Sequence, residues 1–94
     1  MFVVIADIQL KPESVDDFKS WFSESNQILS KFDGFASRRL LETKDGQHRI
    51  LVEFESFEKF GKMHQSNEHE QLHSKAVTFM SKMPSPEFYN VVSQ

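Results

Sequence analysis

The stretch FASRRLLETKDGQHRILVEFE, residues 35–55, decides how this chain folds. At its centre, Asp45-Gly46 separates two runs in which apolar and polar residues alternate. Asp-Gly between such runs is the strongest short-range signal for a β-hairpin. We therefore predict paired strands at residues 35–43 and 48–55. Successive residues of the second strand then point to opposite faces: Ile50, Val52 and Phe54 to one, and Arg49, Leu51, Glu53 and Glu55 to the other.

A strand and a helix are predicted before the hairpin. Residues 2–10, FVVIADIQL, alternate as a strand whose apolar face holds Phe2, Val4, Ala6, Ile8 and Leu10. Pro12 stands where a helix begins, and residues 13–32 repeat apolar side chains at helical spacing. That stripe contains Val15, Phe18, Phe22, Leu29 and Phe32, with Ser25 filling its one gap. Gly34 is a plausible C-cap of this helix.

Two helices and a last strand are predicted after the hairpin. Ser56 can N-cap a short helix over residues 57–64, and Ser66 can N-cap a second one over residues 67–83. The second helix carries a stripe at spacings of three and four residues: His69, Leu72, Ala76, Phe79 and Met83. The tripeptide PSP ends this helix, and EFYNVV forms the last strand at residues 87–92.

The resulting order is β-α-β-β-α-β, the α+β ferredoxin-like arrangement in one domain spanning residues 1–94. Two helices cover one face of a four-stranded antiparallel sheet. In a monomer the other face would contact water, yet it carries apolar side chains: Val3, Ile5, Leu51 and either Tyr89 or Val91. Because exposed apolar patches mark interfaces, we predict a homodimer whose two sheets pack face to face.

Composition excludes several functional classes. The net charge is −3, whereas binding to nucleic acid relies on clustered Lys and Arg. The only close basic pair is Arg38-Arg39. Without cysteine there is no thiolate metal site and no cysteine nucleophile. The N-terminal stretch MFVVIADIQLKP fits neither a signal peptide nor a transmembrane helix, so we expect a cytoplasmic protein with no membrane partner.

Arg38 and Arg39 point to opposite faces of their strand, so one of them must face an apolar side. If that side is the dimer interface, we expect the buried guanidinium to pair with Glu53 or Glu55 of the neighbouring strand. A structural ion pair is favoured over an anion-binding site.

Three motifs together resemble the antibiotic biosynthesis monooxygenase (ABM) domain. They are VVIADIQLKPESVDDFKSWF (residues 3–22), FDGFASRRLLET (residues 32–43) and RILVEFESFEKFGKMHQSNEHEQLH (residues 49–73). Each motif is weak alone, but their order and spacing extend over essentially the whole chain. The resemblance implies a dimeric α+β barrel with a pocket between sheet and helices. The family includes quinol and polyketide monooxygenases that need no metal or flavin, haem-degrading enzymes, and many small proteins of unsettled role.

The leading hypothesis is cofactor-independent oxygenation of a small aromatic or quinol. A deprotonated substrate of this kind supplies its own electrons, so the protein must provide an apolar pocket and a base or hydrogen-bond donor. His73 stands where the resemblance places a functional histidine, and His69 lies one turn before it. The candidate pocket residues are Trp21, Phe22, Phe54, Phe60, Met63 and Phe79. The alternative is a non-catalytic dimer that binds a small hydrophobic ligand.

Two cofactor-dependent readings are disfavoured. Haem-degrading relatives carry an Asn on the first strand, a Trp at the end of the short helix and an axial His on the next helix. Only the histidine is matched here, by His73, since this chain has Ala6 or Ile5 and Met63 at the other two positions. His69 and His73 could share a zinc ion at i and i+4, but no HExxH pattern is present. A third ligand would have to come from His64 or Glu68. We therefore predict no metal and no cofactor, with His64 as a bystander.

Overall fold

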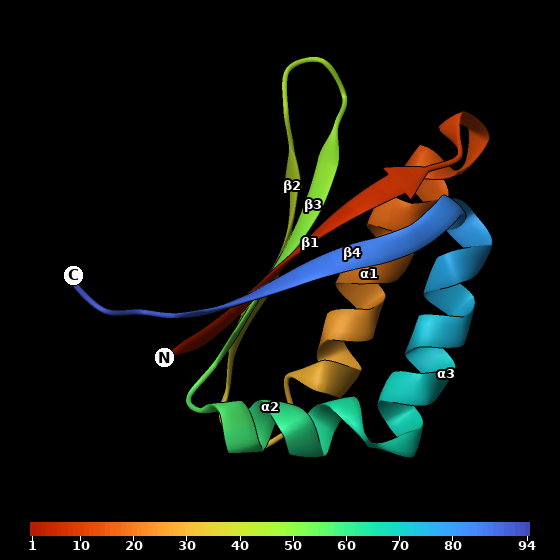
Figure 1. The fold of residues 1–94 in the computed structure, drawn as a ribbon. Helices are drawn as coiled ribbons and strands as arrows, with labels where there is room; N and C mark the ends of the chain where they lie inside the picture. The colour runs from red at the N-terminus through yellow and green to blue at the C-terminus, as the bar shows by residue number, and fades with distance from the viewer.

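A computed structural model describes all 94 residues and shows a single four-stranded sheet covered on one face by helices (Figure 1). The strands are antiparallel and lie in the order β2-β3-β1-β4. The elements are β1 (Phe2–Leu10), α1 (Val15–Leu29), β2 (Phe35–Glu42), β3 (His48–Phe54), α2 (Phe57–His64), α3 (Asn67–Ala76) and β4 (Met80–Asn90), with short 3-10 turns at Pro12–Ser14 and Val77–Phe79. This is the predicted ferredoxin-like α+β fold.

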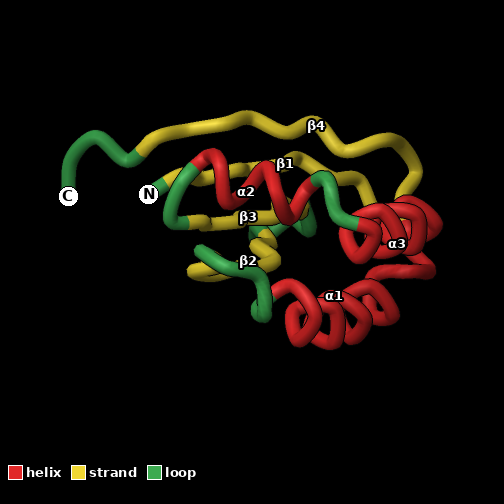
Figure 2. Tube along the Cα trace, turned by 90° about the horizontal axis from the view of Figure 1, so that it is seen from below, coloured by secondary structure: helices red, strands yellow, loops and turns green.

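The two faces of the sheet follow the strand register. Phe2 lies opposite Phe54, and both side chains are buried beneath the helices. Ile5 lies opposite Leu51 on the other face, which no helix covers (Figures 1 and 2). The predicted alternation is therefore confirmed, and the uncovered face carries Val3, Ile5, Leu51 and Tyr89. None of the helices is both long and apolar enough to cross a membrane.

The buried side chains form two separate clusters instead of one continuous core. The first contains Phe2, Val4, Leu29, Phe54, Phe60 and Met63. The second contains Ile8, Phe18, Phe22, Ala76 and Met80. Helix α1 contributes to both, because its stripe runs from Phe18 and Phe22 in one cluster to Leu29 in the other. Ser25, 2% exposed, stands between them.

Helix α1 ends at Leu29, three residues before the predicted boundary. Beyond it, Lys31 N–H donates to Ile28 O and Phe32 N–H donates to Leu29 O, which are the tighter i to i−3 bonds of a helix terminus. Gly34, with φ +83°, then reverses the chain toward β2, as expected of a residue after a helix end.

The predicted boundary between the last helix and the last strand is wrong. Helix α3 ends at Ala76, and β4 begins at Met80 instead of residue 87. Met83 continues the helical spacing of apolar residues, yet it lies in the strand and is 62% exposed. The cause is tertiary: β1 needs a partner along its full length, so Met80 pairs with Leu10. The two prolines of this segment are tolerated because β4 is an edge strand.

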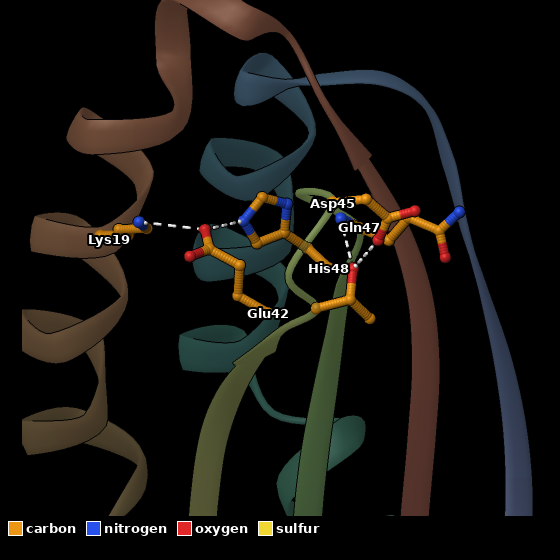
Figure 3. Close-up of polar contacts among 6 residues, drawn as sticks. Lys19, Glu42, Asp45, Gln47 and His48 are labelled. Atoms are coloured by element: carbon orange, nitrogen blue, oxygen red, sulfur yellow. Dashed lines mark hydrogen bonds and ion pairs between the residues drawn. The ribbon is translucent and has the colours of Figure 1, made fainter.

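Polar contacts fix the turn end of the β2–β3 hairpin (Figure 3). Thr43 N–H donates to Gln47 O over 2.9 Å, and Gln47 N–H donates to Thr43 Oγ1 over 2.9 Å. Glu42 accepts from Lys19 Nζ of α1 at 3.1 Å and lies 2.7 Å from His48 Nε2. The hydrogen bond from Lys19, followed by that from His48, lowers the pKa of Glu42. This carboxylate therefore ties the hairpin to α1.

We expect Gly34→Ala to destabilise the protein more than Gly46→Ala. Both glycines have positive φ, +83° and +86°, where any other residue is strained by about 1–2 kcal/mol. A Cβ at Gly34 would also lie 2.8 Å from Lys59 Cβ, whereas a Cβ at Gly46 meets nothing within 4 Å. Because neighbouring groups must shift to avoid that clash, we expect Gly34→Ala to lower the free energy of unfolding by roughly 2–4 kcal/mol. Urea unfolding at constant m-value measures both, and equal midpoints would contradict the expected contact.

Candidate active site

An apolar cavity of about 240 Å³ lies between the covered face of the sheet and the helices. Its walls come from both core clusters, for example Phe54, Phe60 and Met63 from the first and Ala76 and Met80 from the second. The cavity is thus the space left where the two clusters do not meet. An engineered cavity of about 150 Å³ binds benzene, so this one can hold a substituted aromatic ring.

The ionisable groups in the cavity wall are Arg38, His64, His69 and His73, and the wall contains no Asp or Glu. Three of the four are histidines from one short stretch of chain. The α2–α3 corner brings them together, because Ser66 Oγ accepts from His69 N–H at 3.1 Å and donates to Met63 O at 2.6 Å. This N-cap fixes where α3 begins and hence which way its histidines face.

His69 is the central histidine of the three. Its ring centroid lies 4.4 Å from that of His64 and 6.1 Å from that of His73. Burial lowers the pKa of His69 to about 4, with further contributions from the charges of His64, His73 and Arg38. His69 is therefore a neutral imidazole at physiological pH, able to accept a proton or a hydrogen bond at one ring nitrogen.

Arg38 of β2 reaches the cavity from the sheet side, beneath α1. Its Nη1 donates to Ser25 Oγ at 2.7 Å and to Asn26 Oδ1 at 2.8 Å, and its Cζ lies 3.9 Å from the Phe22 ring centroid. Asn26 also donates from Nδ2 to the Arg38 backbone oxygen at 2.8 Å. Burial lowers the pKa of Arg38 to about 10, so it remains a cation at neutral pH.

The ion pair expected if an arginine faced the uncovered side of the sheet is present, with Arg39 as its cation, and the arginine that faces the helices is Arg38. Arg38 faces the helices and is bound by neutral oxygens of α1, whereas Arg39 pairs with Glu53 at 3.1 Å on the uncovered face. Glu53 lies on that same uncovered face and cannot reach the other side of the sheet. The inward-facing guanidinium therefore has no carboxylate partner within 4.0 Å.

Five of the residues expected at the site line the cavity together: His69, His73, Phe54, Phe60 and Met63. The other three aromatic candidates lie elsewhere. Trp21 and Phe79 pack against each other with ring centroids 5.6 Å apart, beside the second core cluster, and Phe22 is a member of that cluster. They fall outside the cavity because the stripe on α1 turns its aromatic half toward α3 and the start of β4.

Sequence reasoning missed the two other ionisable residues of the cavity wall, His64 and Arg38. His64 was expected to be a bystander, but it follows Met63 at the end of α2, where the corner folds its ring onto His69. A signal for Arg38 was present in the sequence. The serine that interrupts the apolar stripe of α1 is the residue that receives the guanidinium.

A larger groove of about 890 Å³ lies near the hairpin end of the sheet. It is open and polar, and its charged side chains are largely paired with one another: Arg49 with Asp7 at 2.6 Å, and His48 with Glu42 at 2.7 Å. The Arg49–Asp7 pair is exposed, and exposed ion pairs of this kind are common and contribute little. The smaller apolar cavity, with its uncompensated cation and clustered histidines, is the better candidate.

The chain belongs to the antibiotic biosynthesis monooxygenase family, since the sequence model of that family matches residues 1–75. None of the curated proteins compared with the chain matches it in sequence. No group of three or more His, Cys, Asp or Glu side chains is arranged to hold a metal ion.

Solved structures show the same fold at low sequence identity. SnoaB from Streptomyces nogalater, described as a cofactor-independent oxygenase, superposes with a TM-score of 0.87 at 9% identity, covering 99% of this chain and 94% of that one. A conserved protein from Methanosarcina mazei has a TM-score of 0.84 at 17% identity, covering 94% and 89%. A protein from Mycobacterium tuberculosis has a TM-score of 0.84 at 14% identity, covering 99% and 96%.

The lowered pKa of His69 makes stability depend on pH. Between pH 6.5 and about 4 the unfolded chain binds a proton at His69 that the folded protein does not. This contribution to stability is present above pH 6.5 and is lost as the pH falls toward 4. Because His69 is partly exposed, solvent weakens this effect. We expect the loss of unfolding free energy between pH 6.5 and about 4 to be smaller in His69→Gln than in wild type by roughly 1–2 kcal/mol.

The measurement is the free energy of unfolding in urea at several pH values across that interval. Gln71→Ala is the matched control, because Gln71 is exposed on the same helix and lies outside the cavity wall. The same pH dependence in wild type and His69→Gln would show that burial does not disfavour the charged imidazole.

Proposed function

We propose that this protein is a cofactor-independent monooxygenase that acts on a small phenol or quinol. The observation that carries the proposal is the cavity, an apolar space whose ionisable wall groups are three histidines and one arginine. Membership of the ABM family supports the same reaction class. The description of SnoaB as a cofactor-independent oxygenase adds support from a protein of the same fold.

The reaction needs only the substrate and dioxygen. A phenol with an unsubstituted para carbon loses its hydroxyl proton and the ring hydrogen, and one oxygen atom forms a carbonyl at that carbon. The second oxygen atom leaves as water. The ring gives up four electrons to form a quinone, and dioxygen accepts them. The protein must therefore favour the anionic ring and exclude bulk water from it.

His69 is the proposed proton acceptor. The low pKa of His69, about 4, keeps its imidazole neutral in the resting protein. Because so low a pKa makes it a weak base, the proton transfer depends on the protein favouring the anionic ring. His64 and His73 are exposed at the cavity wall, and they can pass the proton to solvent. The stacked arrangement of His69 and His73, with centroids 6.1 Å apart, suits transfer through one water molecule.

We expect oxygen uptake with a panel of one-ring and two-ring quinols and phenols. His69→Ala should slow turnover by about 10²–10⁴-fold, the usual contribution of a positioned general base, and His73→Ala should slow it less. Gln71→Ala is the matched control, because Gln71 is exposed on the same helix and lies outside the cavity wall.

Unchanged rates in both histidine variants would remove these residues from the mechanism. Binding of panel compounds to the wild-type cavity without any oxygen uptake would instead favour a non-catalytic module for small hydrophobic ligands. An Ala6→Leu variant, which narrows the cavity, distinguishes binding there from binding elsewhere.

We also propose that the protein forms a homodimer through the uncovered face of the sheet. Val3, Ile5 and Leu51 form the apolar centre of this face. Two ion pairs accompany them, Arg39 with Glu53 at 3.1 Å and Arg49 with Asp7 at 2.6 Å. An apolar centre with a charged rim is typical of a protein interface.

Leu51→Lys should convert the dimer to a monomer, because two buried ammonium groups would face each other across the two-fold axis. Size-exclusion chromatography with light scattering at micromolar concentration measures the mass. Ile28→Lys is the control, since Ile28 is 43% exposed on α1, on the helical side of the molecule. A monomeric wild-type protein would overturn the interface.

A further inference from the structure

Arg38 holds an orientation that leaves part of its guanidinium without a protein partner. Its hydrogen bonds all use Nη1, to Ser25 Oγ at 2.7 Å, to Asn26 Oδ1 at 2.8 Å and to the Phe22 carbonyl oxygen at 3.5 Å. The group also stacks on the Phe22 ring. One edge is therefore anchored to α1, and this anchoring fixes the direction of the remaining N–H groups at Nε and Nη2.

Those remaining N–H groups open onto accessible space. No fully buried polar side-chain atom in the protein lacks a hydrogen-bond partner, and neither Nε nor Nη2 has a partner within the chain. Nε and Nη2 are therefore not fully buried. Arg38 lines the apolar cavity and also a groove of about 510 Å³ between α1 and β2.

The charge in the cavity wall is unbalanced. Arg38 has no carboxylate within 4.0 Å, and no Asp or Glu lines the cavity. His69 is neutral at physiological pH, so it adds no positive charge and can only donate or accept a hydrogen bond. A partly buried cation among apolar groups is costly unless an anion accompanies it, and the cavity offers room for one.

We propose that Arg38 is the counter-cation of the substrate, so that the cavity binds an aromatic anion, a phenolate of one or two rings, with its oxygen at Nε and Nη2. The inference rests on the proposed function and specifies its substrate class. The ring lies against the apolar wall formed by Phe54, Phe60 and Met63. Arg38 favours the deprotonated substrate, and His69 accepts the proton that the phenol releases.

Equilibrium binding of two probes of similar size, measured without turnover, tests the anion site at Arg38. The probes are 4-nitrophenolate, at a mildly alkaline pH where the phenol is ionised, and 4-nitroanisole, which is neutral. Wild-type protein should prefer the phenolate by about tenfold to a hundredfold, the range for a hydrogen bond to a charged group. Arg38→Gln should abolish the preference and leave binding of the anisole unchanged.

Arg39→Gln is the matched control, because Arg39 is the next residue on the same strand and faces away from the cavity. Arg38→Gln removes the charge and keeps an amide donor, but the shorter side chain ends before the position of Nη1. If Arg38→Gln does not fold, the preference of the wild-type protein for phenolate over anisole decides the matter. Equal affinities, or binding of neither probe, would overturn the proposal.

Two further variants locate the bound probe. Ala6→Leu narrows the cavity and should weaken phenolate binding, whereas Ser23→Trp fills the groove between α1 and β2 and should not. The reverse result would overturn the cavity as the anion site. Phenolate binding that depends on Arg38, without oxygen uptake from any phenol or quinol, would leave the anion site standing and reject the monooxygenase.

Discussion

The contact between Arg38 and the middle of α1 organises the interior of this protein. A serine and an asparagine on successive positions of the helix accept from one guanidinium nitrogen, at 2.7 and 2.8 Å. A charged group cannot be packed among apolar side chains without such partners. The apolar stripe of α1 is therefore interrupted at Ser25, and the buried side chains divide into two clusters on either side of it. The cavity lies between these clusters.

The same division explains the electrostatics of the cavity. A continuous core would have left no room for ionisable groups, whereas the gap admits one arginine and three histidines without any acid. Burial keeps His69 neutral, and the charges of Arg38 and the two other imidazoles add to this effect. A neutral imidazole and a fixed cation in one apolar space are complementary to the proton and the anion of an ionising phenol.

Family membership and site chemistry rest on different grounds. The ABM sequence model matches residues 1–75, while the superposed structures, at 9–17% identity, establish the fold. Folds of this kind carry many functions, so the reaction has to be inferred from the side chains in the cavity. The uncovered sheet face is a second consequence of the fold, because helices on one side leave Ile5 and Leu51 without cover.

The sequence by itself determined the order of the elements, the faces of β1 and β3, and the N-caps at Ser56 and Ser66. These features depend on neighbouring residues, through alternation, helical spacing and local hydrogen bonds. Only the tertiary structure decided where α3 stops, because pairing with β1 outweighs a helical pattern that continues to Met83. It alone decided that Arg38 is bound by neutral oxygens and that the histidines meet at one cavity. Both depend on how separate elements pack, because Arg38 of β2 contacts α1 and the histidines of the α2–α3 corner face a cavity against the sheet.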